Sequence, residues 1–292
     1  MIQKRLSEHL KDKFGCKVYK LSISGGMTCP NRDGKVGTRG CIFCSDMGSG
    51  EFAEKVCSDI SAQLQRAKSR VAKKVKDGKY IAYFQSFTNT YADTDYLRKI
   101  FFEAITPEDI VGLAIATRPD CLPDEVIALL KELNSVKPVW VELGLQTVNE
   151  KTAEYIRRGY KTEIFDSAVA RLKKAGIETV AHMIIGLPFE SAEDCVATAR
   201  HISELGVDGI KFHLLHIIKG TDLEKEYAKG TFEALTLEEY TDILKSCISA
   251  LREDIIIHRL TGDGDKRTLV APLWSGDKKR VLNYINKILD NA

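Results

Sequence analysis

Three cysteines are grouped on a glycine-rich stretch near the N-terminal end of the chain. Cys29, Cys41 and Cys44 follow the spacing C-x11-C-x2-C. Three thiolates can hold three irons of a [4Fe–4S] cube and leave the fourth iron open. Because most protein-bound clusters use four cysteines, a set of three indicates an iron that takes up a substrate or cofactor. The chemistry that this spacing suggests therefore goes beyond electron transfer.

Two other chemistries are compatible with the same spacing. The pair Cys41 and Cys44 can belong to a zinc site whose fourth ligand is Cys16 or Cys57. A CxxC pair can also act as a redox dithiol. The spacing alone leaves these alternatives open.

The cysteines do not look like the disulfide framework of a secreted protein. The N-terminal stretch is charged and amphipathic, so we expect no signal peptide. No apolar run approaches the ~18 residues of a membrane span, so we expect no membrane association. In the reducing cytoplasm, where we place the chain, clustered thiols indicate metal binding or catalysis. Cys121, Cys195 and Cys247 are expected to be buried structural thiols.

Composition and charge set broad limits. The chain has 292 residues, of which 44% are hydrophobic and 29% charged, which is typical of one large globular domain or one domain with an extension. The net charge of +2 gives no strong signal for a polyanionic partner. The longest basic stretch, Arg66 to Lys79, is interpreted as the solvated face of a helix, with nucleic-acid contact as the alternative.

Short apolar runs alternate with amphipathic segments along most of the chain. The expected strands are 18–22, 80–84, 112–116, 139–143, 179–185 and 209–214. The expected helices between them are 58–76, 93–104, 123–134, 163–175 and 191–205, with Asp93 and Ser191 as N-caps. This alternation predicts a parallel sheet with helical crossovers, either open or closed as a barrel. Both arrangements gather ligands at the carboxyl ends of the strands, where the cysteine stretch follows the first strand.

The pattern changes after His216. Helices are expected over 235–252 and 277–289, with a short strand over 255–258. The stretch HRLTGDGDKRTLVAPLWS, residues 258–275, is rich in glycine and charge. We interpret it as a functional loop, with an ordinary surface connection as the alternative.

Together these motifs resemble the radical SAM superfamily. The three cysteines follow the first strand, as in its cluster loop, although the usual spacing there is C-x3-C-x2-C. The long first gap resembles the branch related to the catalytic subunit of Elongator. Four later stretches agree in order and placement with the ends of the third to sixth strands: TRPD at 117–120, ELGLQT at 142–147, HMIIGLP at 182–188 and KFHLLHIIKGT at 211–221. The resemblance covers nearly the whole chain and is strongest to a bacterial family of small Elongator-like proteins.

The resemblance implies an α/β fold: a partial (βα)6 TIM-like barrel over 1–216, with the cluster loop at 29–44, and a C-terminal α/β extension over 217–292 that closes the barrel. It also implies two cofactors. Cys29, Cys41 and Cys44 would bind a [4Fe–4S] cluster, and the amino and carboxylate groups of S-adenosylmethionine would chelate its open iron. One-electron reduction then yields a 5′-deoxyadenosyl radical.

Several residues are expected to hold S-adenosylmethionine on the strength of this resemblance. Phe43 would lie near the adenine. Gln85 and Ser86 would contact the methionine amino group; they belong to FQSFTNTY, which replaces the usual glycine-rich stretch after the second strand. Thr117 belongs to the TRPD stretch at the end of the third strand.

Four further polar residues are expected at or near strand ends. Glu142 and Gln146 would hydrogen-bond the ribose or the methionine portion, and His182 would hold the ribose. Arg158 would pair with the methionine carboxylate through its bidentate guanidinium fork. The alternative for each is a buried polar group that serves the barrel.

Two histidines follow on the sixth strand. His213 and His216 are candidates for substrate contact or acid–base chemistry, with a structural role as the alternative. His258, Arg259, Asp263 and Lys266 form a polar group that we expect at the barrel mouth.

The resemblance implies an enzyme that acts on the C5 side chain of the tRNA wobble uridine and converts carboxymethylaminomethyluridine to aminomethyluridine. The implied partners are tRNA and a one-electron donor such as flavodoxin or ferredoxin. One alternative is a radical SAM enzyme with a small metabolite or a protein as substrate. Another is a non-enzymatic zinc-binding nucleic-acid module.

Overall fold

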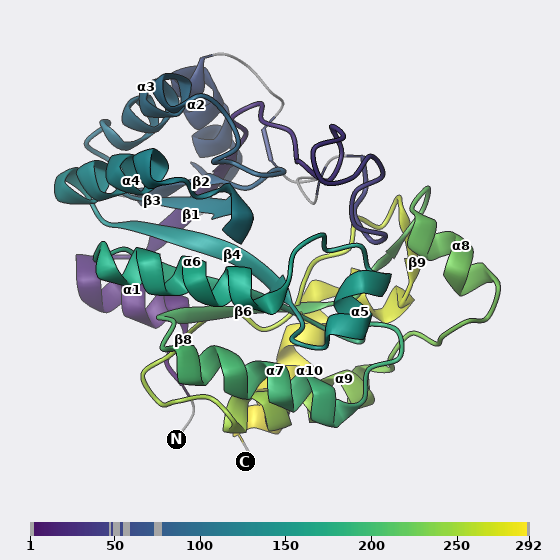
Figure 1. The fold of residues 1–292 in the computed structure, drawn as a ribbon. Helices are drawn as coiled ribbons and strands as arrows, with labels where there is room; N and C mark the ends of the chain where they lie inside the picture. The colour runs from purple at the N-terminus through teal and green to yellow at the C-terminus, as the bar shows by residue number, and fades with distance from the viewer. Residues whose placement is uncertain (1–2, 47, 49–52, 55–58, 73–77, 291–292) are drawn as a thin grey trace.

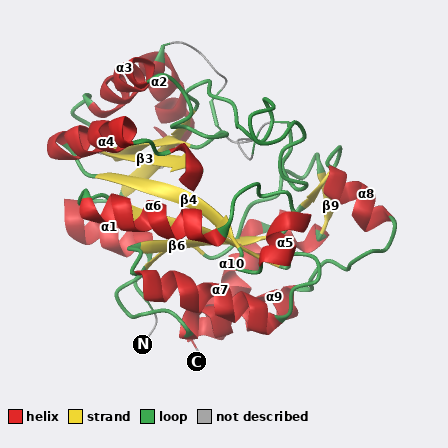
Figure 2. Ribbon diagram, viewed as in Figure 1, coloured by secondary structure: helices red, strands yellow, loops and turns green. Residues whose placement is uncertain are grey.

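A parallel β-sheet forms the centre of the molecule (Figures 1 and 2). The computed structural model describes residues 3–46, 48, 53–54, 59–72 and 78–290. The sheet has seven strands, in the order β1-β2-β3-β4-β5-β6-β8, and every neighbouring pair is parallel. The strands are β1 (Val18–Ile23), β2 (Lys79–Phe84), β3 (Ile110–Thr117), β4 (Val139–Gln146), β5 (Glu178–Ile185), β6 (Gly209–Leu214) and β8 (Ile256–Arg259).

Because the strands lie side by side in chain order, successive right-handed crossovers place their helices on the same face, and the sheet curls into a partial barrel. The crossover helices are α2 (Ile60–Val71), α3 (Thr94–Ile105), α4 (Asp124–Val136), α5 (Glu150–Tyr155), α6 (Thr162–Lys174), α7 (Ala192–Leu205), α8 (Asp222–Ala228) and α9 (Leu237–Ser249). Helix α1 (Leu6–Phe14) precedes the first strand, and α10 (Lys278–Asp290) follows the last.

The predicted fold class is confirmed, with one strand more than expected. All six predicted strands are present, and their bounds differ from the predicted ones by at most two residues at either end, apart from the longer β4. The short strand predicted in the C-terminal part is β8, and it pairs with β6 as the seventh strand of the sheet. The helix predicted over 58–76 is described as α2, and residues 73–77 lie outside the described residues.

Local sequence signals explain where the helices begin. The Asp93 carboxylate accepts a hydrogen bond from the Asp95 backbone N–H at the start of α3. Ser191 and Asp194 form a reciprocal capping box at the start of α7. Both caps were predicted from the sequence, and both satisfy backbone donors that a helix leaves unpaired in its first turn.

Strand β4 shows how the sheet divides its side chains between two faces. The odd-numbered residues from Val139 to Leu145 pack in the main apolar core beneath the helices. Trp140 belongs to the apolar group on the other face, and Glu142, Gly144 and Gln146 line a cavity there. The period of two along a strand therefore sends polar side chains into the barrel from a strand that is otherwise apolar.

The C-terminal part is continuous with the barrel. Tyr240 and Leu244 of α9 and Val281 and Ile285 of α10 belong to the same apolar core as the six earlier strands. Strands β7 (Ile217–Ile218) and β9 (Leu269–Ala271) form a separate antiparallel pair beside the carboxyl ends of the barrel strands (Figure 1). The division at residue 216 stays a prediction; the structure shows one core on both sides of it.

The structure also bears on the basic stretch and on the expectation that the chain has no membrane span. Lys68 of the basic stretch pairs with Asp109, and Arg66 and Arg70 both pair with Glu54. Part of the basic charge in α2 is thus used within the protein. Among the described residues, no helix combines the length and the apolar character that a bilayer span requires.

Candidate active site

A cavity of about 400 Å³ lies at the carboxyl ends of the barrel strands. It gathers nearly all the residues predicted from the sequence as site residues: Cys29, Cys41, Phe43, Cys44, Gln85, Thr117, Glu142, Gln146, Arg158, His182, His213 and His216. Ser86 is the exception, because it is buried nearby without lining the cavity. Of the polar group predicted at the barrel mouth, Arg259 and Asp263 line the cavity, whereas His258 and Lys266 do not.

The loop that carries the cysteines is organised around Asn31. The Asn31 carbonyl accepts a hydrogen bond from the Gly40 backbone N–H, and its side-chain amide donates to the Arg157 carbonyl and to Cys41 Sγ, 3.6 Å away. A Cβ atom at Gly37 would lie 2.4 Å from Asn31 Oδ1, which accounts for glycine at that position. The sequence motif thus encodes a folded loop rather than a free one.

A cluster of apolar side chains packs beneath this loop and positions it over the barrel. Ile42, between two of the cysteines, packs with Ile156, Ile184, Leu215 and Leu223. The Ile42 backbone N–H donates to the Ile156 carbonyl, and the Leu223 N–H donates to the Ile42 carbonyl at 3.0 Å. The segment after residue 216 therefore helps to position the cysteines.

The three thiols fit the ligand set of a [4Fe–4S] cluster. All three line the cavity and are partly accessible. The hydrogen bond with Cys44 lowers the pKa of Cys41, which favours the thiolate that metals bind. In the described ranges, no three His, Cys, Asp or Glu side chains converge as a single metal ion would require. A cube takes one thiolate for each of three irons, so it does not need such convergence.

The structure excludes one of the two cysteines proposed as the fourth ligand of a zinc site. Cys16 precedes β1, whereas the cysteine loop follows it, and a strand of six residues spans roughly 20 Å. Cys16 therefore lies at the opposite edge of the sheet from the other three thiols. Cys57, the other ligand proposed for zinc, lies outside the described residues.

Gln146 ends β4 in a strained conformation. Its φ of 64° lies in the left-handed region, and the pairing with β5 shifts register between Gly144 and Gln146. The Tyr160 hydroxyl donates to the Gly144 carbonyl at 2.6 Å and lies 3.3 Å from Gln146 Oε1. Backbone strain of this kind is found at binding sites, where it directs a side chain toward a ligand. The sequence carried no signal for the part played by Tyr160.

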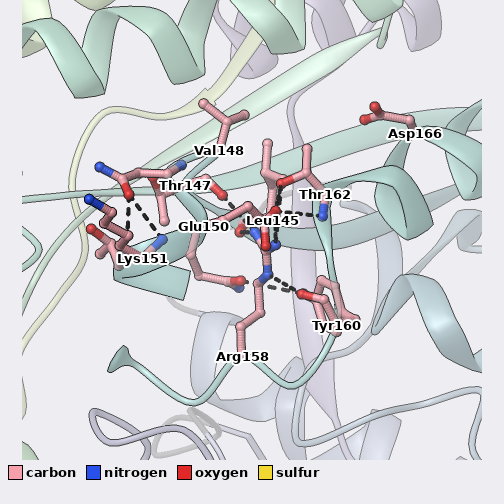
Figure 3. A network of polar contacts seen from close by, with 12 residues as sticks. Leu145, Thr147, Val148, Glu150, Lys151, Arg158, Tyr160, Thr162 and Asp166 are labelled. Carbon is pink, nitrogen blue, oxygen red and sulfur yellow. Dashed lines mark hydrogen bonds and ion pairs between the residues drawn. The ribbon is translucent and has the colours of Figure 1, made fainter. Parts of the chain in front are cut away.

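Arg158 requires a correction. Its side chain is 1% exposed, and all five guanidinium N–H donors have acceptors within the protein (Figure 3). These acceptors are the backbone carbonyls of Leu145, Thr147 and Tyr160 and the side-chain oxygens of Glu150 and Thr162. Pairing with the methionine carboxylate would break one or more of these bonds. We therefore assign Arg158 to positioning, since it ties the end of β4 to the turn before α6.

Replacing Arg158 with methionine is expected to lower the free energy of unfolding by about 3 kcal/mol or more, because three carbonyls lose their donor and each buried acceptor left without a partner costs about 1–3 kcal/mol. Arg171→Met serves as the control, since that guanidinium is 39% exposed and its partner Asp124 is 95% exposed. An exposed pair contributes less than about 1 kcal/mol. Urea unfolding compares the two variants, and losses of equal size would contradict the positioning role.

Arg118 is a site residue that the sequence did not single out, although it belongs to the TRPD stretch. Its guanidinium forms two parallel hydrogen bonds with Asp120, at 2.9 and 2.7 Å, and donates a third to the Arg158 carbonyl. Burial opposes its charge, but Asp120 raises the pKa of Arg118 above its ordinary value. A permanent cation therefore lines the cavity wall.

Glu142 also requires a correction, because it is the centre of a buried polar network. The side chain is fully buried. Oε1 accepts from Lys20 Nζ at 2.9 Å and from Trp140 Nε1 at 3.1 Å, while Oε2 accepts from Lys211 Nζ and lies 3.0 Å from His182 Nε2. Burial would raise its pKa, but Lys20 and Lys211 hold it well below the ordinary value. With four donors around it, the carboxylate has no acceptor position left for a ribose or an amino group.

The histidines of the cavity are neutral near pH 7. Burial lowers the pKa of His182 to about 4, although its hydrogen bond with Glu142 opposes the shift. Because Nε2 faces that carboxylate, Nδ1 is left as an acceptor, which is compatible with a ribose hydroxyl. Burial lowers the pKa of His213 well below its ordinary value and that of His216 to about 4. The Nε2 atoms of His213 and His216 are buried and have no hydrogen-bond partner among the described residues.

The shifted histidines predict a loss of stability in acid. A histidine with a folded pKa near 4 stays neutral between pH 6.5 and 4, while the unfolded chain takes up a proton below about pH 6.5. Falling pH therefore favours unfolding, by about 2 kcal/mol at pH 5 for each such residue. In His216→Gln, the drop in unfolding free energy between pH 7.5 and 5 is expected to be smaller than in the wild type by this amount. Equal drops in urea titrations would contradict the assignment.

A curled parallel sheet with a three-cysteine loop over the ends of its strands defines an enzyme that places a reactive cofactor inside a partial barrel. Comparison with known families agrees with this class. The family model for the Radical SAM superfamily matches residues 33–202, and the model for the Radical_SAM C-terminal domain matches residues 207–291. The chain belongs to the radical SAM superfamily and is an enzyme of that class. Its cofactors are a [4Fe–4S] cluster and S-adenosylmethionine.

Individual proteins with similar sequences or folds come from bacteria and archaea. It is 46% identical to the uncharacterized protein YtqA of Bacillus subtilis over 98% of this chain and 89% of that protein. It is 27% identical to the tRNA uridine(34) acetyltransferase of Methanocaldococcus jannaschii over 52% of this chain and 28% of that protein. Its fold matches that of the archaeal Methanocaldococcus infernus Elp3 with a TM-score of 0.68 at 19% identity, over 92% of this chain and 63% of that one.

Proposed function

We propose that this enzyme acts on tRNA, at the C5 side chain of the wobble uridine, and converts carboxymethylaminomethyluridine to aminomethyluridine. The observation that carries the proposal is the similarity over 156 residues to an archaeal tRNA uridine(34) acetyltransferase. Because the chain spans about a quarter of that relative's length, acetyl transfer is not part of the proposal. The structural match to Elp3 supports the proposal to the extent that the two proteins share the fold of the barrel.

Different residues of the cavity would bind the cluster and S-adenosylmethionine. When bound, the cluster and S-adenosylmethionine supply a 5′-deoxyadenosyl radical that abstracts hydrogen. Cys29, Cys41 and Cys44 hold the cluster at the cavity edge. The strained Gln146 and the neutral His182 orient S-adenosylmethionine, with Phe43 against its adenine. Thr117 and Gln85, which also line the cavity, are retained as contacts to it.

The reaction implies two partners. An electron must reach the cluster for each activation, and we propose a small one-electron donor such as flavodoxin or ferredoxin. The substrate is tRNA, which places the enzyme in the cytoplasm. Phosphate contacts make binding of tRNA fall steeply with salt.

The test is anaerobic reconstitution followed by incubation with S-adenosylmethionine, dithionite and bulk tRNA from a strain that lacks the protein. 5′-Deoxyadenosine is quantified, and digested tRNA is analysed by mass spectrometry. Formation of deoxyadenosine with loss of a carboxymethyl group from the wobble uridine supports the proposal. Deoxyadenosine with unchanged tRNA rejects it and favours a small metabolite or a protein as the substrate. The Cys41→Ala variant is the matched control for background cleavage.

A further inference from the structure

The floor of the cavity contains more positive than negative charge. Lys20 of β1 and Lys211 of β6 both bind the Glu142 carboxylate, and their side chains are only 19% and 7% exposed. In the described part of the chain, Glu142 is the single carboxylate with which either lysine forms an ion pair. Two buried lysines thus share one carboxylate, so this group is positively charged overall when both lysines are protonated.

A third cation adds to this excess. Arg259 of β8 lines the same cavity, and its nearest carboxylate is Asp263, at 3.9 Å. Asp263 is engaged more closely by Lys278, at 2.6 Å. Within the described residues, Arg259 therefore has no carboxylate that it pairs with closely and does not share. Burial, together with Lys20 and Arg259, lowers the pKa of Lys211 well below its ordinary value, even though Glu142 opposes the shift.

An unpaired imidazole lies beside these cations. His213 follows Lys211 by two residues on β6, so both side chains project from the same face of the sheet. Its ring centroid lies 5.0 Å from that of His182, and its Nε2 atom is buried without a partner in the part of the chain that the structure describes. A buried polar atom that lacks a partner costs free energy, and such atoms are rare unless a ligand completes them.

We propose that this cationic floor, formed by Lys211, His213 and Arg259, with Lys20 behind Glu142, binds the carboxylate of the substrate side chain. The identity of that substrate, a carboxymethylaminomethyl group on uridine, rests on the proposed function. A carboxylate bound beside Lys211 would oppose the lowering of that lysine's pKa and so favour its charged form. It would also give His213 the hydrogen-bond partner that it lacks.

The depth of the floor separates it from the edge that carries the cysteine loop, whereas His182, which pairs in register with Lys211, lies at the depth of the floor. Lys211 lies three residues before the end of β6, and Glu142 lies four residues before the end of β4. At ~3.3 Å per residue, the floor is roughly 10 Å below the edge that carries the cysteine loop. Cys29, Cys41 and Cys44 would hold the cluster, and with it the carboxylate of S-adenosylmethionine, at that edge. A tRNA phosphate is attached to the ribose and cannot follow a base side chain to this depth.

The floor also distinguishes substrate from product. The carboxymethylaminomethyl side chain ends in a carboxylate that the floor attracts. The aminomethyl product has lost that carboxylate and retains an amine, which is cationic near neutral pH and is repelled by the two lysines. Selectivity of this kind combines an attractive contact with the substrate and a repulsive one with the product.

The test measures binding of three anticodon stem–loops that differ only in the wobble side chain: carboxymethylaminomethyl, its carboxamide and aminomethyl. The proteins are the cluster-loaded wild type, Lys211→Met and Lys211→Arg, with the exposed Lys131→Met as the control. We expect the wild type to bind the carboxylate form about thirtyfold more tightly than the carboxamide. Lys211→Met removes this preference, Lys211→Arg retains most of it, and Lys131→Met leaves it unchanged.

The outcomes separate this inference from the proposed reaction. A wild type that binds the carboxylate and carboxamide forms equally, or binds neither, overturns the inference whether or not variants fold. Turnover of carboxymethylaminomethyl tRNA without a carboxylate preference preserves the reaction and rejects the floor. A carboxylate preference without turnover preserves the floor and rejects the reaction. Retained preference in Lys211→Met, with an unchanged circular dichroism spectrum, rejects the role of Lys211.

Discussion

Replacing Cys41 with alanine will abolish cluster loading and the formation of 5′-deoxyadenosine, whereas replacing Cys16 will leave both unchanged. Cys41 lies on the cavity with Cys29 and Cys44, and its thiol is hydrogen-bonded within the folded loop. Cys16 precedes β1, at the opposite edge of the sheet. A cube held by three thiolates has no spare protein ligand, so the loss of one is not compensated.

The measurement is iron and sulfide content for each chain after anaerobic reconstitution, followed by quantification of deoxyadenosine. About four irons for each chain in the wild type and in Cys16→Ala, with near background in Cys41→Ala, is the expected result. Loss of iron in Cys16→Ala would make Cys16 a fourth cluster ligand and reject the three-cysteine assignment. Full activity in Cys41→Ala would reject the cluster loop itself.

The sequence was sufficient for the sheet and for the cysteine loop. Apolar runs such as 139–143 and 179–185 carry the strand signal locally, and the order of strands in the sheet then follows from chain order. The cysteine loop follows the first strand, so the carboxyl-edge rule placed it correctly over the cavity. The exception is β8: its strand was predicted as part of the C-terminal extension, and no sequence pattern indicated that it pairs with β6 as a seventh strand of the sheet.

The roles of Glu142 and Arg158 could not be predicted from local sequence patterns. A polar residue at or near a strand end can meet a ligand or a protein partner, and the partners that decide this are distant in sequence. Lys20 and Lys211 lie 122 and 69 residues from Glu142. For Arg158 the deciding acceptors are mostly backbone carbonyls, which carry no sequence signal. Local patterns therefore located the site but could not assign which of its residues face the ligand.

Replacing Glu142 with glutamine will lower the free energy of unfolding by about 3–5 kcal/mol, because Lys20 and Lys211 then remain buried with no counter-charge. The control is Glu132→Gln, whose side chain is 47% exposed in its pair with Arg98 and whose loss should cost less than about 1 kcal/mol.

A second substitution tests the physical cause. If unpaired charge produces the loss, then adding Lys211→Met to Glu142→Gln will restore part of the stability, because one of the two uncompensated ammonium groups is gone. If Glu142 acts instead through its hydrogen bonds to Trp140 and His182, the double variant will be no more stable than Glu142→Gln. Urea unfolding of the four proteins in this double-mutant cycle gives the coupling energy.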